Sequence, residues 1–128
     1  MDHHPRNEIA ALLEAWMTAL ETRDPATVAA LYAEDAVLLP TVSNEVRKTP
    51  AAIERYFDHF LKKLPKGQII QQNIRLFDGL AINSGIYSFN LTVDGVAGDV
   101  LCRFTFVYRR DPDGGWKIIE HHSSVMPE

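Results

Sequence analysis

The chain has 128 residues and a mass of 14.4 kDa, with 13 basic and 17 acidic side chains and a formal net charge of −4. A chain of this length forms one domain with its own core. Its acidic balance, without a stripe of Lys or Arg, excludes the electrostatic footprint of a protein that binds nucleic acid or anionic membranes.

Nothing in the sequence directs the chain into or across a membrane. No apolar run approaches the ~18–20 residues that a spanning helix needs, and the first residues lack the basic and apolar regions of a secretory signal. A single cysteine, Cys102, excludes an internal disulfide and a multi-cysteine metal site. We therefore expect one cytoplasmic domain over residues 1–128, with residues 1–7 as a flexible tail.

Two helices are predicted in the first quarter of the chain. The first follows from apolar residues at spacings typical of one helix face, namely Ile9, Leu12, Leu13, Trp16 and Leu20. Asp24 and Pro25 then mark a second, short helix, with the carboxylate as N-cap and the proline in the first turn. This short helix is expected to bury Val28, Leu31 and Tyr32.

A short strand over residues 36–39 is ended by Pro40, and a polar turn follows it. Thr49 and Pro50 repeat the combination of cap and proline and begin a third helix. Its apolar stripe comprises Ile53, Phe57, Phe60, Leu61 and Leu64.

The pattern changes to strands after Gly67. Segments rich in β-branched and aromatic residues cover 69–77, 81–93, 100–110 and 116–124, and turns that contain Asp and Gly separate them. Three helices followed by an antiparallel meander predict an α+β fold, in which the helices cover one face of a strongly bent sheet.

Three segments together resemble a known family: Leu31 to Val37, Leu38 to Asn44 and Trp116 to Ser124. They are similar to nuclear-transport-factor-2-like (cystatin-like cone) domains. Within these they resemble the association domain of calcium/calmodulin-dependent protein kinase II (CaMKII) and its free-standing bacterial SgcJ/EcaC-type relatives. The resemblance runs from Glu8 to the C-terminus. It implies a cone-shaped, curved antiparallel sheet wrapped over three N-terminal helices, a conical pocket between them, and a homodimer through the sheet, sometimes stacked into larger rings.

Arg103 lies among apolar neighbours on a predicted strand, where an unpaired charge is costly. The CaMKII association domain is similar in placing an arginine in its pocket from the matching strand, aligned with Arg103 or Thr105. The resemblance implies a fork for a ligand carboxylate, and the alternative is a structural ion pair with a neighbour such as Glu120. At Ser88, where the kinase domain carries a second pocket arginine, this sequence departs from the family.

Two adjacent histidines, His121 and His122, lie on the last predicted strand and must face opposite sides of the sheet. An imidazole in the pocket could exchange a proton near neutral pH. The alternative is a hydrogen-bonded histidine with a structural role. The aligned segment of the kinase domain also carries a histidine at His122, so the resemblance favours His122 for the interior, while the residues alone leave open which of the two histidines faces the pocket.

Aromatic side chains complete the predicted pocket. Tyr87 could offer its phenol to a developing oxyanion, or belong to the core with its hydroxyl at the rim. Trp16 and Tyr56 lie on apolar helix stripes, which form the core and, in this fold, the pocket walls. The predicted ligand-binding residues are thus Arg103, His122, Tyr87, Tyr56 and Trp16.

The sequence lacks the signatures of metal and nucleotide chemistry. The histidines have no HxH or HExxH spacing, and no Gly-rich phosphate loop is present, so we expect no metal and no cofactor. Two functions remain open. The first is a small-molecule pocket protein that holds a small, partly apolar anion, with or without a proton-transfer step. The second is a homo-oligomerisation module without catalytic activity. Both include a second copy of the chain as partner, and neither a nucleic acid nor a membrane.

Overall fold

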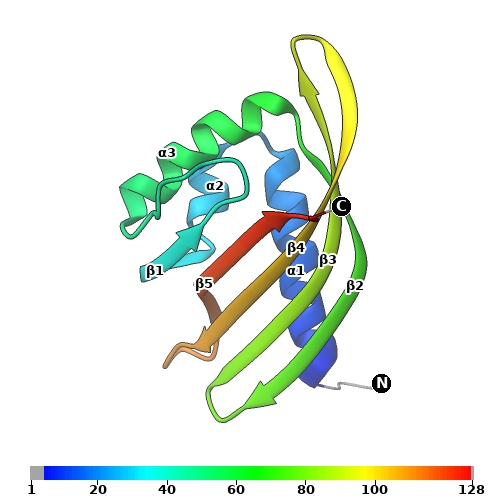
Figure 1. Ribbon diagram of the computed structural model, residues 1–128. Helices are drawn as coiled ribbons and strands as arrows, with labels where there is room; N and C mark the ends of the chain where they lie inside the picture. Colours follow the sequence, from blue (N-terminus) through cyan, green and yellow to red (C-terminus); the bar gives the residue numbers. More distant parts are fainter. Residues whose placement is uncertain (1–4, 128) are drawn as a thin grey trace.

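The computed structural model describes residues 5–127 as three α-helices and one five-stranded sheet (Figure 1). The helices are α1 (Pro5–Glu21), α2 (Pro25–Ala29) and α3 (Pro50–Phe60), and the 3₁₀ turn η1 (Leu61–Lys63) continues α3. The strands are β1 (Tyr32–Leu39), β2 (Lys66–Phe77), β3 (Leu80–Val93), β4 (Val96–Arg110) and β5 (Trp116–Val125). These elements confirm the predicted α+β fold.

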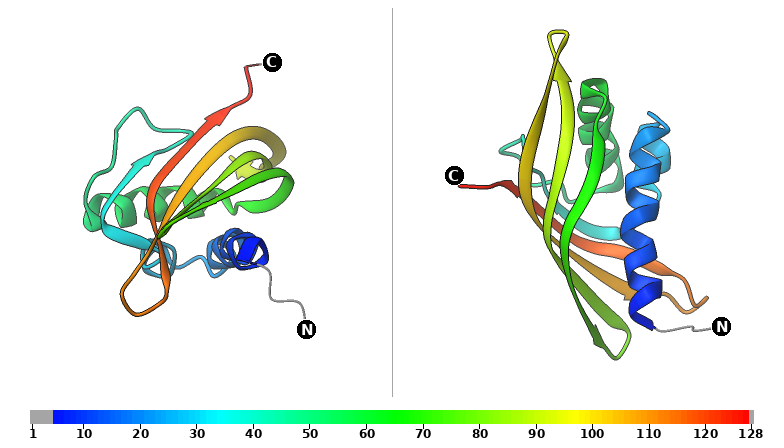
Figure 2. Two further views of the ribbon diagram at one scale, coloured as in Figure 1. Left: turned by 90° about the horizontal axis from the view of Figure 1, so that it is seen from below. Right: turned by 90° about the vertical axis from the view of Figure 1, so that its right-hand side faces the viewer.

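The sheet has the strand order β1-β5-β4-β3-β2 and is curved, with helices on its concave side. Strand β1 runs parallel to β5, and all other neighbours are antiparallel. Figure 2 shows α1 and α3 on the same side of the sheet, which we call the inner face. Within the described residues no helix covers the opposite side, the outer face.

The starts of α2 and α3 confirm their predicted caps. The Asp24 carboxylate accepts a hydrogen bond of 3.1 Å from the backbone N–H of Ala26. The Thr49 hydroxyl accepts one of 3.1 Å from the N–H of Ala52. Each cap is followed directly by a proline, whose missing N–H would have had no partner inside the helix.

Several boundaries differ from the sequence prediction: β2 begins at Lys66 and β4 at Val96, three and four residues early, and three further differences follow. Residues 5–7, expected in a flexible tail, form the first turn of α1, and residues 1–4 of that tail lie outside the described residues. Strand β1 begins at Tyr32, four residues early, because its parallel pairing with β5 extends it. Leu64 does not lie on the α3 stripe: it ends η1 in the left-handed conformation (φ 52°) and is 51% exposed.

A β-bulge in β5 decides which of its side chains face the helices. Val107 of β4 pairs with Glu120, but the next residue, Tyr108, pairs with Ile118, so that Ile119 is an extra residue on β5. The bulge shifts the alternation by one position. As a result Ile118 and His121 both lie on the inner face, although they are three residues apart.

A second bulge bends β2 across β3. The pairing of β2 with β3 shifts register between Ile69 and Gln71, close to Gly85 on β3. A Cβ atom on Gly85 would fall on the backbone carbonyl of Gln71. The glycine therefore allows the close approach of the two backbones at the point where the sheet curves.

Aromatic rings form a large part of the core between the sheet and the helices. Trp16 of α1 stacks on Tyr87 with 5.9 Å between ring centroids, and its edge meets Phe57 and Phe106. These buried rings come from α1, α3, β3 and β4, so they join both layers of the fold.

Candidate functional site

The conical space that the sequence analysis expected as a pocket is almost filled by side chains. A cavity on the inner face is lined by Trp16, Leu38, Pro40, Thr41, Tyr56, Phe57, Phe60, Tyr87, Phe89, His121 and Ser123. Its free volume is about 10 Å³, which is enough for about one water molecule. An organic ligand would therefore have to displace core side chains to enter it.

His121 lies at the centre of this cavity wall, where the β5 bulge places it. Its ring stacks on Phe106 with centroids 3.8 Å apart and is 3% exposed. The Tyr32 hydroxyl lies 2.8 Å from Nδ1, and the Tyr87 hydroxyl lies 3.2 Å from Nε2. Both ring nitrogens thus have a phenol as their partner.

The neighbouring bonds assign the direction of each proton. Trp16 Nε1–H donates to the Tyr32 oxygen at 3.2 Å, and the Tyr87 hydroxyl donates to Ser123 Oγ at 2.7 Å. Because each phenol has only one proton, Tyr87 accepts from Nε2–H of His121, and Tyr32 donates to Nδ1. With this assignment both ring nitrogens of His121 and the hydroxyls of Tyr32 and Tyr87 have compatible partners.

Burial keeps the three titratable groups of this network neutral. Desolvation, with a smaller repulsion from His122, lowers the pKa of His121 to about 3. Desolvation also raises the pKa of Tyr32 and of Tyr87 well above the ordinary value, against the opposing hydrogen bonds from Trp16 and to Ser123. The lone pair of His121 is already used by Tyr32, so the network as it stands is a satisfied polar part of the core.

Three of the five predicted ligand residues, Trp16, Tyr56 and Tyr87, line this cavity. The other two do not. Arg103 and His122 are exposed on the outer face of the sheet, so the prediction that they line the pocket is wrong for this cavity.

The strand register explains both errors. Tyr87 pairs with Cys102, so the two share the inner face and Arg103 must point away from it. The β5 bulge brings His121, rather than His122, to the inner face. The alternative for Arg103, an ion pair with Glu120, does not form either. Arg103 of β4 lies opposite Ser124 of β5, whereas Glu120 of β5 lies opposite Val107, farther along β4.

Sequence reasoning also missed partners that the tertiary fold supplies. Tyr32 was expected only as a buried residue of a short helix, but it starts β1 and reaches His121 across 89 positions of sequence. Thr41, from the polar turn after β1, donates a short hydrogen bond to Ser123. No local pattern marks either contact, because each depends on the pairing of β1 with β5.

The outer face carries uncovered apolar side chains beside Arg103 and His122. Leu101, paired with Ser88, is 42% exposed, and Phe77 at the end of β2 is 55% exposed. Further half-buried apolar residues on this face are Ile82, Ile86 and Val107. Charged and apolar side chains are thus mixed across the face.

Two further kinds of site are not found in the part of the chain that the structure describes. Over residues 5–127, no three His, Cys, Asp or Glu side chains lie close enough together to hold a metal ion. No helix in the same range is long and apolar enough to cross a membrane.

The sequence matches the calcium/calmodulin dependent protein kinase II association domain family over residues 5–127. Curated protein sequences give no significant match. A solved structure from Xanthomonas campestris, described as a protein of the same association-domain kind, is 53% identical, with a TM-score of 0.93 over 99% of this chain and 91% of that one.

More distant structures share the fold alone. The hub of a CaMKII from S. rosetta is 16% identical, with a TM-score of 0.82 over 98% of this chain and 100% of the hub. A protein of the nuclear-transport-factor-2-like kind with a cystatin-like fold, from Novosphingobium aromaticivorans, is 18% identical. Its TM-score is 0.79 over 95% of this chain and 82% of that protein.

Proposed function

This chain belongs to the calcium/calmodulin dependent protein kinase II association domain family, and from that premise we propose that it is a homo-oligomerisation module that pairs with a second copy through the outer face of its sheet. The observation that carries the proposal is the apolar content of an outer face that no described helix covers. The nearly filled inner cavity, about 10 Å³, favours this function over ligand binding at that position.

The outer face suits a two-fold interface. Its apolar residues Ile82, Ile86 and Val107 sit on the two central strands, with Arg103 and Glu120 beside them. In a two-fold dimer the same patch contacts itself, so a central apolar area with charges around it can be complementary to its copy. Burial of such side chains contributes about 25 cal/mol per Å² of apolar area.

Val107→Lys tests the interface without a large risk to the monomer fold. Position 107 pairs across the strands with Glu120, so a lysine has an opposite charge as its cross-strand neighbour in the monomer. In the dimer, the same charge would be buried at the centre of an apolar patch, which is costly. We expect the wild type to sediment as a dimer or larger assembly at micromolar concentrations, and Val107→Lys to sediment as a monomer.

Leu64→Lys is the matched control. Leu64 is 51% exposed at the end of η1, which continues α3 on the helix side of the sheet, so the same change there should leave the assembly intact. Circular dichroism of both variants checks that they are folded. A monomeric wild type, or a Val107→Lys variant that is folded and assembles as the wild type does, would refute this function.

A further inference from the structure

A second pocket lies between α3 and the segment that follows β1. It has a volume of about 220 Å³ and is lined by Val42, Ser43, Arg47, Tyr56, His59, Phe60 and Lys63. Three of these side chains are basic types, and none is a carboxylate. The pocket shares Tyr56 and Phe60 with the inner cavity, but it is more than twenty times larger.

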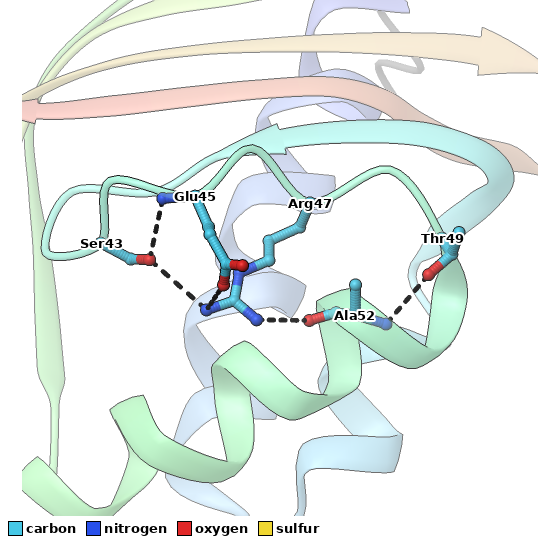
Figure 3. A network of polar contacts seen from close by, with 5 residues as sticks. All are labelled: Ser43, Glu45, Arg47, Thr49 and Ala52. Carbon is cyan, nitrogen blue, oxygen red and sulfur yellow. Dashed lines mark hydrogen bonds and ion pairs between the residues drawn. The ribbon is translucent and has the colours of Figure 1, made fainter.

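Arg47 is held rigidly at this pocket. Its backbone N–H and carbonyl both bond to Leu38 of β1 at 2.9 Å. Its side chain extends toward the first turn of α3 and is only 12% exposed (Figure 3). The guanidinium carbon lies 5.8 Å from the centre of the Tyr56 ring, which favours a cation at this place.

The Arg47 guanidinium is poorly satisfied by the protein itself. It contacts the Ala52 carbonyl, Ser43 Oγ and Glu45 Oε2, each at 3.4 Å (Figure 3). Charge-assisted N–H···O bonds are usually about 2.7–2.9 Å long. Its Nε atom is buried and has no hydrogen-bond partner. A guanidinium has five N–H groups, and the three contacts of Arg47 are all long, so it has capacity for a better acceptor.

The carboxylate that contacts Arg47 in the described part of the chain is easily displaced. The Glu45 side chain is 78% exposed and meets Arg47 at 3.4 Å. Exposed ion pairs of this kind are weak and are screened by salt. Figure 3 shows Glu45 on the loop beside Arg47, and it does not line the pocket.

We propose that this pocket binds a small carboxylate with an apolar body, whose carboxylate replaces Glu45 at the Arg47 guanidinium. Other polar groups that line the space around such an anion are the hydroxyl of Ser43, the imidazole of His59 and the ammonium of Lys63. The apolar body would contact Tyr56 and Phe60. This site lies apart from the outer face, so the inference goes beyond the proposed assembly and does not depend on it.

The walls and the volume define the ligand class. Aromatic and aliphatic side chains, among them Val42, form much of the lining and favour an apolar body over a bare inorganic anion. The volume of about 220 Å³ lies below the ~300–1,000 Å³ of sites for drug-sized molecules. A monocarboxylate of the size of benzoate fits these limits.

Titration of the full-length chain with benzoate, followed by two-dimensional ¹H–¹⁵N NMR, tests the site. Benzamide, the neutral analogue, and inorganic phosphate are the comparison probes. We expect saturable shifts with benzoate at residues of α3 and of the segment between β1 and α3. Benzamide and phosphate should bind more weakly, because the first lacks the charge and the second lacks the apolar body.

Three variants make the test specific. Arg47→Gln should weaken benzoate binding by at least about tenfold, since a hydrogen bond to a charged group is lost. Glu45→Gln removes the competing carboxylate and should strengthen binding by roughly two- to fivefold. Arg55→Gln is the matched control: Arg55 is exposed on α3 and does not line the pocket, so its loss should leave affinity unchanged.

Several results would overturn the proposal. One is equal binding of benzamide and benzoate, and another is tighter binding of phosphate than of benzoate. A third is the absence of saturation, or saturation with shifts elsewhere in the protein. If Arg47→Gln does not fold, the variants Glu45→Gln and Arg55→Gln still test the proposal, because both residues are exposed. Equal benzoate affinities of these two variants would contradict the role of Arg47.

Discussion

Acidification should destabilise this protein through the buried ring of His121. The folded-state pKa of this histidine is about 3, because burial disfavours the charged imidazolium. In the unfolded chain a histidine titrates near 6.5. The unfolded state therefore binds a proton at a pH where the folded state does not, so this contribution to stability is complete above pH ~6.5 and is lost as the pH falls toward 3.

The size of the effect follows from the two pKa values. At pH 5 the unfolded histidine is almost fully protonated and the folded one is almost fully neutral. Between pH 7 and pH 5 the free energy of unfolding should fall by about 2 kcal/mol from His121 alone. With a urea m-value of about 2 kcal/mol/M, the unfolding midpoint should move down by about 1 M.

Urea unfolding at pH 7, 6 and 5, followed by tryptophan fluorescence, measures this loss. Wild type is compared with His121→Gln, which lacks the titrating ring, and with the matched control His122→Gln, an exposed histidine one position along β5. All samples need the same protein concentration, because assembly makes stability depend on concentration.

The comparison between variants separates the contribution of the His121 ring to the loss of stability from that of the carboxylates, which also titrate on acidification. The loss between pH 7 and pH 5 should be about 2 kcal/mol smaller in His121→Gln than in the wild type, and unchanged in His122→Gln. Equal pH profiles for wild type and His121→Gln would refute the assignment of a neutral, buried His121.

Two further predictions concern stability. Tyr87→Phe leaves Nε2–H of His121 without its partner and removes one of the two hydroxyl groups that bond to Ser123, so it should cost about 1–3 kcal/mol by urea unfolding. Tyr108→Phe removes a buried hydroxyl that has no hydrogen-bond partner, so its stability should equal or exceed that of the wild type; similar losses in both variants would contradict the hydrogen-bond network. Gly85→Ala places a methyl group against the Gln71 carbonyl and should cost about 3 kcal/mol. Gly98→Ala, where the added Cβ meets no atom within 4 Å, should change stability by less than about 0.5 kcal/mol, and equal effects at the two glycines would refute the close approach of β2 to β3.

Local sequence signals were sufficient for the elements of the fold. Asp24 and Thr49 cap helices as predicted, because a side-chain oxygen followed by proline acts on the nearest backbone N–H groups. The turn at residues 94 and 95 joins β3 to β4 with two consecutive positive φ angles, as an Asp-Gly pair predicts. These features depend on a few neighbouring residues, and sequence alone therefore predicts them.

The site was predicted only in part. Trp16, Tyr56 and Tyr87 line the inner cavity, because apolar stripes and strand alternation mark the buried side, and their role in binding a ligand stays a prediction. Arg103 was assigned to the interior by resemblance to a family, although a strand residue between Cys102 and Phe104 must face outward once those two are buried. A family resemblance indicates which fold a chain adopts, but it does not show which residues of each strand face inward, because that depends on the strand register.

Composition, helix stripes, caps and turns determined by themselves that this chain has an α+β fold with a curved sheet over N-terminal helices. The tertiary structure alone decided that His121 faces inward, because one extra residue in β5 reverses the alternation of that strand. It also decided that the inner cavity is nearly full, and that Arg47 has unused hydrogen-bonding capacity. Volume and hydrogen-bond satisfaction depend on contacts between residues far apart in the sequence, which no local pattern specifies.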